Sequence, residues 1–328
     1  MNHANSKKCK IQDNERGGGE GTNSSTKKKR NTNMDLIKIF AVFSVVSIHF
    51  FLYTGFYEQE LEGFAGYSAV TGRTFFMICV PLFIITTGFL MNKKELSKRY
   101  YKGIIKVIAV YILASAACAV FRIKYLWEEA DVWRWVESIF NYSAAPYSWY
   151  VEMYIGLFLV IPFLNLAYNG LKSKKGKLIL IFTLIALTAL PTVINYKYKI
   201  FPDYWEEVYP ITYYFIGAFF SEFKINIKKR YILITLLACL FIFGGFNYYR
   251  SITSGTGQVK LDIYSEYWCG FENLIDSVLV FMFIQKLNFE KLPDIVKTIL
   301  KKYRSLPLGR IYCHIFLTRF FMTFLTIE

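Results

Sequence analysis

Residues 36–57 read LIKIFAVFSVVSIHFFLYTGFY, and this stretch decides the fold class. Lys38 is its only side chain with a full charge at neutral pH, and His49 is its only imidazole. A helix needs about 20 mostly apolar residues to cross the hydrocarbon core of a bilayer. The stretch is long enough and apolar enough, so it predicts a transmembrane helix.

Eight further runs of the same kind follow along the chain. They lack the alternation of apolar and polar residues that is typical of strands in an outer-membrane barrel. The nine predicted spans are 36–57, 74–91, 103–123, 148–168, 177–194, 208–223, 231–248, 269–287 and 308–327. We therefore predict an all-α fold, a polytopic transmembrane helix bundle of nine or ten spans.

The composition excludes several classes of protein. Hydrophobic residues make up 54% and charged residues 19% of the 328 residues, whereas soluble domains carry about 25% charged residues. These charges are too few for a soluble enzyme of the usual kind, and the chain is too apolar to be largely disordered. The six cysteines include no C-x-x-C pair, so we expect neither a metal site nor a disulfide framework.

The formal charge of +15 is concentrated in alternate segments between the predicted spans. If the N-terminus is cytoplasmic, the inner segments and adjoining helix ends, with Lys38 included, hold 30 of the 39 Lys and Arg residues, and the outer segments and helix ends hold 16 of the 24 acidic residues. Cytoplasmic loops of membrane proteins carry an excess of Lys and Arg. The charge therefore predicts a cytoplasmic N-terminus and argues against nucleic-acid binding. Residues 1–33 are predicted to be a disordered basic cytoplasmic tail ahead of a membrane domain, 34–328.

One stretch between the predicted spans is also rich in aromatic residues. Residues 124–147 combine three tryptophans with four acidic residues. This pattern is typical of an amphipathic segment that lies on the membrane surface. We predict that it lies on the outer surface and acts as an aromatic anchor.

Ionisable side chains at membrane depth are costly and often mark functional sites. Lys38 and His49 are eleven residues apart, which on an α-helix places them within about 20° of one face and about 16 Å apart along the axis. His49 is the only histidine well inside a confidently predicted span, so it is the candidate for proton transfer at neutral pH. The alternative is a snorkelling lysine and a histidine that bonds to a neighbouring helix.

Three further features could carry chemistry. Lys98, Arg99 and Lys102 stand at the inner start of the third predicted span, where they could hold phosphates or could belong only to the basic cytoplasmic pattern. Glu152 is a carboxylate in the outer half of the fourth predicted span. Arg73 stands at the outer mouth of the second, where it could hold an anion or meet lipid headgroups.

A pair of carboxylates lies in the eighth predicted span. Glu272 and Asp276 are four residues apart, with Asn273 beside them, so both carboxylates share one face of a helix. They could form a cation site, a proton relay or a hydrogen-bonded packing cluster, and the sequence leaves these three alternatives open.

Five short motifs follow one another on the predicted spans. They are MDLIKIFAVFSVVSIH at 34–49, VPLFIITTGFL at 80–90, the Lys-Arg pair at 98–99, Ser-Trp-Tyr at 148–150 with Pro162 downstream, and Tyr-Phe-Ile-Gly at 214–217. In this order the motifs resemble the acyltransferase-3 family of integral membrane acyltransferases. The resemblance covers about residues 33–320, which is nearly all of the chain outside the tail.

The resemblance implies an enzyme in the plasma membrane of a bacterium. Such an enzyme moves an acyl group, often acetyl, from cytoplasmic acyl-CoA to a hydroxyl of an envelope carbohydrate or of a related or lipid-linked acceptor. His49 matches the essential histidine of the first helix. Lys38 stands where the family commonly has arginine, so it keeps the charge but lacks the bidentate fork.

The resemblance also suggests roles for the other candidates. Arg99 and Lys102, with Lys98 nearby, match the basic motif that would hold the phosphates of CoA. We expect His49 to act as the general base, Arg73 or a nearby amide to stabilise the oxyanion, and Glu152 to orient the imidazole.

The C-terminal end departs from the family pattern. Ile-Tyr-Cys-His at 311–314 is one residue shorter than the usual Ile-Tyr-x-x-His, and we predict nine spans where the family commonly has ten. A shortened or altered end would explain both differences and leaves the role of His314 open. From the residues alone, two other classes also fit: a transporter or flippase of a small polar solute or lipid-linked sugar, and a structural or sensory membrane protein.

Overall fold

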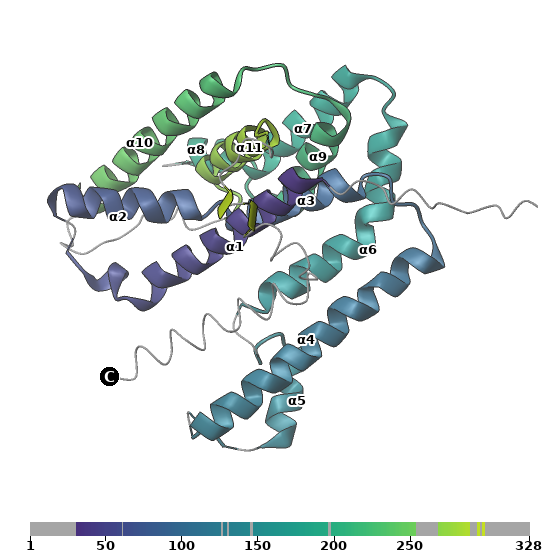
Figure 1. Ribbon diagram of the computed structural model, residues 1–328, viewed down its shortest axis with the longest axis vertical. Helices are drawn as coiled ribbons and strands as arrows, with labels where there is room; N and C mark the ends of the chain where they lie inside the picture. Colours follow the sequence, from purple (N-terminus) through teal and green to yellow (C-terminus); the bar gives the residue numbers. More distant parts are fainter. Residues whose placement is uncertain are drawn as a thin grey trace, which may run out of the picture. The chain divides into compact units, whose positions relative to one another are not determined.

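The stretch that predicted the first span forms one continuous helix, α1 (Thr32–Tyr53). The computed structural model describes residues 31–60, 62–125, 127–129, 131–144, 147–195, 198–253, 268–288, 294–295 and 297–298. The other helices (Figure 1) are α2 (Gly63–Phe76), α3 (Cys79–Met91), α4 (Lys98–Tyr125), α5 (Val132–Phe140), α6 (Trp149–Gly170), α7 (Lys174–Thr188), α8 (Pro191–Ile194), α9 (Tyr209–Glu222), α10 (Lys229–Thr253) and α11 (Phe271–Gln285). No strand occurs among these residues, so the predicted all-α fold is confirmed for them.

Six helical segments are long and apolar enough to cross a membrane: α1, α2 with α3, α4, α6, α7 with α8, and α10. Each overlaps one of the predicted spans, although α1 ends four residues before the end of the predicted span 36–57. Two more predicted spans, 208–223 and 269–287, correspond to α9 and α11, which have 14 and 15 residues and are shorter than the roughly 20 residues of a full crossing. The ninth predicted span, 308–327, and the predicted tail up to residue 30 lie outside the described residues.

α2 and α3 are two halves of one interrupted helix. The predicted span begins at residue 74, whereas the helical structure begins at Gly63 and is interrupted at residues 77–78. Pro81 explains the interruption, because its ring clashes with the carbonyl of Met77 and it has no N–H to donate to that carbonyl. As a result, Arg73 lies in the last turn of α2.

α3 and α9 cross with their backbones in contact inside the main hydrophobic core. A Cβ atom added at Gly88 would lie 2.0 Å from the carbonyl oxygen of Tyr214, and one added at Gly217 would lie 2.0 Å from that of Ile85. Small residues allow membrane helices to approach this closely. α1 and α11 also pack against α3, so this crossing fixes the centre of the fold.

Polar contacts join several helix ends at one end of the bundle. We call this the basic end, and it consists of the start of α1, the ends of α3, α6, α9 and α11, and the starts of α4, α7 and α10. Asn165 of α6 donates to the Met91 carbonyl oxygen at 2.8 Å, and Asn33 of α1 donates to the Gln285 carbonyl oxygen at 3.0 Å. Lys177 of α7 pairs with Glu222 of α9 at 2.6 Å. These contacts require the helices to alternate in direction.

The basic end collects segments that the sequence predicts to be cytoplasmic. Segments 92–106, 169–178 and 221–230 contain 6, 4 and 4 Lys and Arg residues, and all three begin or end the helices named above. The structure thus agrees with the alternation that the charge pattern predicted. Which side of a membrane this end faces stays a prediction.

The predicted amphipathic segment contains α5, a nine-residue helix. The Asp131 carboxylate caps its start by accepting from the backbone N–H groups of Trp133 and Arg134 at 2.9 and 3.4 Å. Trp133 and Phe140 are 81% and 78% exposed. This apolar face is left uncovered, as in a helix that lies on a membrane surface.

Candidate active site

His49 lies in the last turn of α1 and is half-buried. Its ring stacks on the ring of Tyr147, with the centroids 3.9 Å apart and the planes inclined by 25°. The Tyr53 ring lies 6.5 Å from the imidazole on the same helix. The hydroxyl groups of Tyr53 and Tyr147 share a hydrogen bond. Two aromatic residues therefore position the imidazole, one on its own helix and one from the segment before α6.

Tyr147 reaches His49 through a left-handed backbone conformation. Its φ angle is 61°, a region that residues other than glycine rarely occupy and that costs about 1–3 kcal/mol. The stack with His49 and the hydrogen bond to Tyr53 help to hold this conformation. Tyr147 was not among the residues predicted for the site, although it directly precedes the quoted motif at 148–150.

Lys38 is half-buried nearer the start of α1. Because α1 is uninterrupted, Lys38 and His49 keep the predicted placement on one face, about 16 Å apart along the axis. Lys38 is near the basic end of the bundle, and His49 is near the opposite end. The helix thus separates a cation from a titratable ring along one face.

Arg73 is buried, with 4% of its surface exposed. Its Nε donates to the Tyr57 hydroxyl at 3.0 Å, and the guanidinium lies 5.8 Å from the centre of the Tyr57 ring. The alternative of a contact with lipid headgroups at the mouth of a span does not fit this burial. Arg73 instead lies ten residues inside α2, because the helix begins earlier than the sequence predicted.

Glu152 is exposed in the first turn of α6. Among the described residues, its carboxylate forms no hydrogen bond or ion pair, and its electrostatic influence falls on Tyr111 of α4. The structure therefore does not bring Glu152 into contact with His49. The side chain that contacts the imidazole of His49 is that of Tyr147, whereas the sequence led us to expect Glu152 there.

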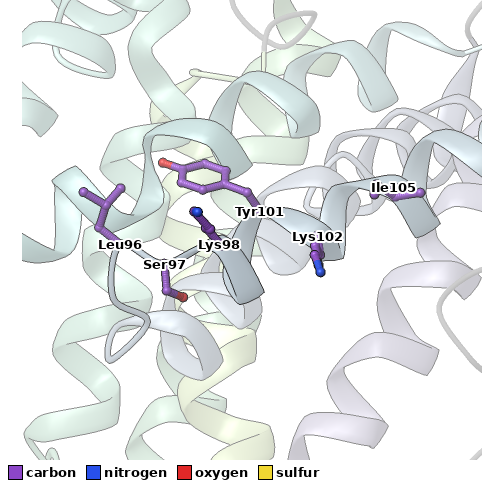
Figure 2. A pocket seen from close by; sticks show the side chains of 6 residues that line it. All are labelled: Leu96, Ser97, Lys98, Tyr101, Lys102 and Ile105. Carbon is purple, nitrogen blue, oxygen red and sulfur yellow. The ribbon is translucent and has the colours of Figure 1, made fainter.

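The predicted phosphate-binding residues form the first turns of α4. A surface hollow of about 560 Å³ is lined by Leu96, Ser97, Lys98, Tyr101, Lys102 and Ile105. Figure 2 shows these six side chains along the start of the helix. Lys98, Tyr101, Lys102 and Ile105 share a face because they are three, four and seven residues apart.

Arg99 is exposed at the same end but does not line this hollow. The structure thus brings Lys98 and Lys102 together and separates Arg99 from them. The hollow has a mainly apolar wall with two cations at its edge, which suits an amphipathic ligand that carries phosphate.

Glu272 and Asp276 are both 1% exposed in α11. Asn247 of α10 donates to Glu272 Oε2 and to Thr74 Oγ1, both at 3.0 Å. The sequence analysis named neither Asn247 nor Thr74, although an asparagine within the apolar run 231–248 marks a buried polar contact. In the described part of the chain, no group of three or more His, Cys, Asp or Glu residues could hold a metal ion.

Comparisons with known proteins support the resemblance in the motifs. The model of the acyltransferase-3 family, described as an acyltransferase domain, matches residues 31–327. Neither the search of curated proteins nor that of solved structures gives a significant match. With six apolar helical segments of spanning length in the part of the chain that the structure describes, the protein is a multi-pass membrane protein. Because the match extends over essentially the whole chain, the chain belongs to the acyltransferase-3 family.

Proposed function

We propose that the protein moves an acetyl group from cytoplasmic acetyl-CoA to a hydroxyl group of an envelope carbohydrate or a lipid-linked acceptor. The enzyme would act in the plasma membrane of a bacterium, with residues 1–33 as a basic cytoplasmic tail and a membrane domain of nine or ten spans. The observation that carries this proposal is the match of residues 31–327 to the acyltransferase-3 family.

His49 is the proposed general base of the reaction. Its neutral imidazole takes the proton of the acceptor hydroxyl as the hydroxyl oxygen attacks the thioester carbonyl. The C–O bond forms, the C–S bond breaks, and the departing thiolate of CoA receives the proton from the imidazolium. The stack on Tyr147 supports this role, because it fixes the plane of the ring before the acceptor arrives.

Two buried or half-buried cations assist the proposed reaction. Arg73 stabilises the oxyanion that forms on the thioester carbonyl, since a guanidinium already held by Tyr57 needs little reorganisation. Lys38 supplies positive charge between the basic end and His49. Glu152 remains a second candidate for orienting the imidazole, although the described contact to His49 comes from Tyr147.

The donor phosphates are proposed to bind at the start of α4. Lys98 and Lys102 line the hollow, the N-terminus of the helix favours anions, and Arg99 adds positive charge to the same end of the helix without lining the hollow. The apolar wall of the hollow would contact the uncharged arm of CoA. An acyl-enzyme route through a serine or through His49 itself stays open under this proposal.

The test of the base is transfer of labelled acetyl from acetyl-CoA by the purified protein. General-base catalysis contributes typically 10²–10⁴-fold, so His49→Gln should lower the transfer rate by about that factor. Ser47→Ala is the matched control, because Ser47 lies on the same helix and bonds only the Phe43 carbonyl. Full activity of His49→Gln would remove His49 from the mechanism.

The phosphate site is tested by the KM for the donor. Lys98→Gln and Lys102→Gln should each raise this KM by about tenfold with little change in kcat, because each removes an exposed charge-assisted contact of about 1.5 kcal/mol. Lys93→Gln is the control, since Lys93 is exposed at the basic end but does not line the hollow. An unchanged KM would refute this placement of the donor.

The family match does not favour a transporter or flippase.

A further inference from the structure

A second polar site lies between α2, α10 and α11, away from the contacts of His49. Asn247 is 0% exposed and reaches from α10 toward the carboxylates of α11. Its amide nitrogen donates to Glu272 and Thr74. Three helices therefore contribute oxygen-bearing side chains to one buried cluster, which we call the α11 cluster: Thr74, Asn247, Glu272 and Asp276.

The α11 cluster contains three acceptor atoms that lack a donor. Glu272 Oε1, Asp276 Oδ1 and Asn247 Oδ1 have no hydrogen-bond partner among the described residues. Buried polar atoms in folded proteins are nearly always paired, because each unpaired atom loses its hydration without compensation. Three such oxygens in one cluster indicate that a positively charged species completes it.

The charges around the α11 cluster are unevenly distributed. Arg73 and Arg250 both act on Glu272, and the N-terminus of α11 also favours a negative charge in its first turn. The only charged group that acts on Asp276 in the described part of the chain is Glu272, a like charge. From α10, Cys239 also faces Asp276. Among the described residues, Asp276 thus has no cation that acts on it.

The chemistry of the oxygens favours a hard monovalent cation. Carboxylate and carbonyl oxygens without His or Cys select hard ions, and a monovalent ion would supply the cation that Asp276 lacks among the described residues. In membrane proteins, interrupted helices hold Na⁺ at the ends of their half-helices. α2 is such a half-helix, and Thr74 lies in its last turn. We propose that the α11 cluster binds one Na⁺ through Asn247, Glu272 and Asp276.

The proposal is tested by thermal unfolding of the purified full-length protein in detergent at pH 7.5. Replacing choline chloride by NaCl at equal ionic strength should raise the Tm in a saturable way, by about 3–8 °C, because an ion that binds only the folded state stabilises it. Asp276→Asn should abolish the dependence on Na⁺. Glu207→Gln is the matched control, since it removes an exposed carboxylate and should keep the dependence.

Binding of radioactive sodium to the wild-type protein gives a second measurement that does not depend on folding of a variant. One ion per chain is expected, and no bound ion would overturn the proposal. An equal Tm of the wild type in both salts would also overturn it. If acidification in choline chloride gives the full rise and Na⁺ adds nothing, a proton fills the site and the sodium proposal is wrong. None of these measurements depends on acyl transfer, so the proposed activity could fail while this site stands.

Discussion

At the residue scale, Tyr147 connects backbone strain to the proposed chemistry. Its left-handed backbone (φ 61°) is unfavourable for a bulky residue, yet it brings the ring onto His49 and the hydroxyl onto Tyr53. Residues in such conformations persist where the surrounding structure holds them in place, and they concentrate at functional sites. The geometry therefore favours a role for Tyr147 in positioning the imidazole.

Two substitutions of Tyr147 should distinguish the contribution of its ring from that of its hydroxyl group. Aromatic pairs contribute about 0.5–1.5 kcal/mol beyond area burial, so Tyr147→Ala should lower kcat by roughly 2- to 13-fold. Tyr147→Phe keeps the stack and should stay within about twofold of the wild type. Initial rates of labelled acetyl transfer measure both variants. Equal losses for the two variants would show that the hydroxyl, rather than the ring, positions His49.

At the scale of elements, close backbone packing determines which helices hold the site together. The crossing of α3 and α9 brings their backbones into contact at two glycines, and α1 also packs against α3. A change at this crossing would therefore move α3 and, through it, the helix that carries His49. Stability of the fold and geometry of the site depend on the same contact.

Alanine at either glycine of this crossing should destabilise the protein. The added Cβ of Gly88→Ala or Gly217→Ala would lie 2.0 Å from a facing carbonyl oxygen, and overpacking of this kind costs about 1–3 kcal/mol or more. A fall in the Tm in detergent measures the effect. Gly156→Ala in α6 is the control, because its Cβ meets nothing within 4 Å and alanine favours a helix by about 1 kcal/mol. A similar fall in all three variants would contradict the packing argument.

The ion pair that joins α7 to α9 should also contribute to stability. Lys177 is 7% exposed, and its Nζ lies 2.6 Å from Glu222 and 4.3 Å from the centre of the Tyr168 ring. Lys177→Met would leave Glu222 without its partner and should cost about 1.5–3 kcal/mol, since hydrogen bonds to charged groups have this net value.

Two comparisons in detergent unfolding check this estimate. Lys177→Met combined with Glu222→Met should cost less than the single change, because no carboxylate is then left without its cationic partner. The surface pair of Lys199 and Asp203, at 2.8 Å, is the control, and Lys199→Met should cost less stability than Lys177→Met, because solvent screens an exposed pair. Equal losses at the two pairs would show that burial does not strengthen the contact.

At the scale of the whole molecule, the sequence predicted what depends on hydropathy and charge. It predicted the all-helical fold, the long apolar helices and the alternation of basic segments, because each follows from local composition. It did not predict that Arg73 is buried, since the start of α2 at Gly63 precedes the most apolar part of the span. Nor did it predict that Tyr147 contacts His49 or that Asn247 contacts Thr74. These partners are 98 and 173 positions apart in the sequence, so local composition does not indicate the contacts.

The direction of the chain across the membrane is the last prediction. The basic end carries the excess of Lys and Arg, and such segments stay in the cytoplasm, so Ser97 near Lys98 should face inward and Ser143 after α5 should face outward. Both serines are exposed. In a variant without the native cysteines, Ser143→Cys should react with a membrane-impermeant maleimide in intact cells. Ser97→Cys should react only after permeabilisation, and the reverse pattern would place His49 on the cytoplasmic side and remove the proposed route of the acyl group.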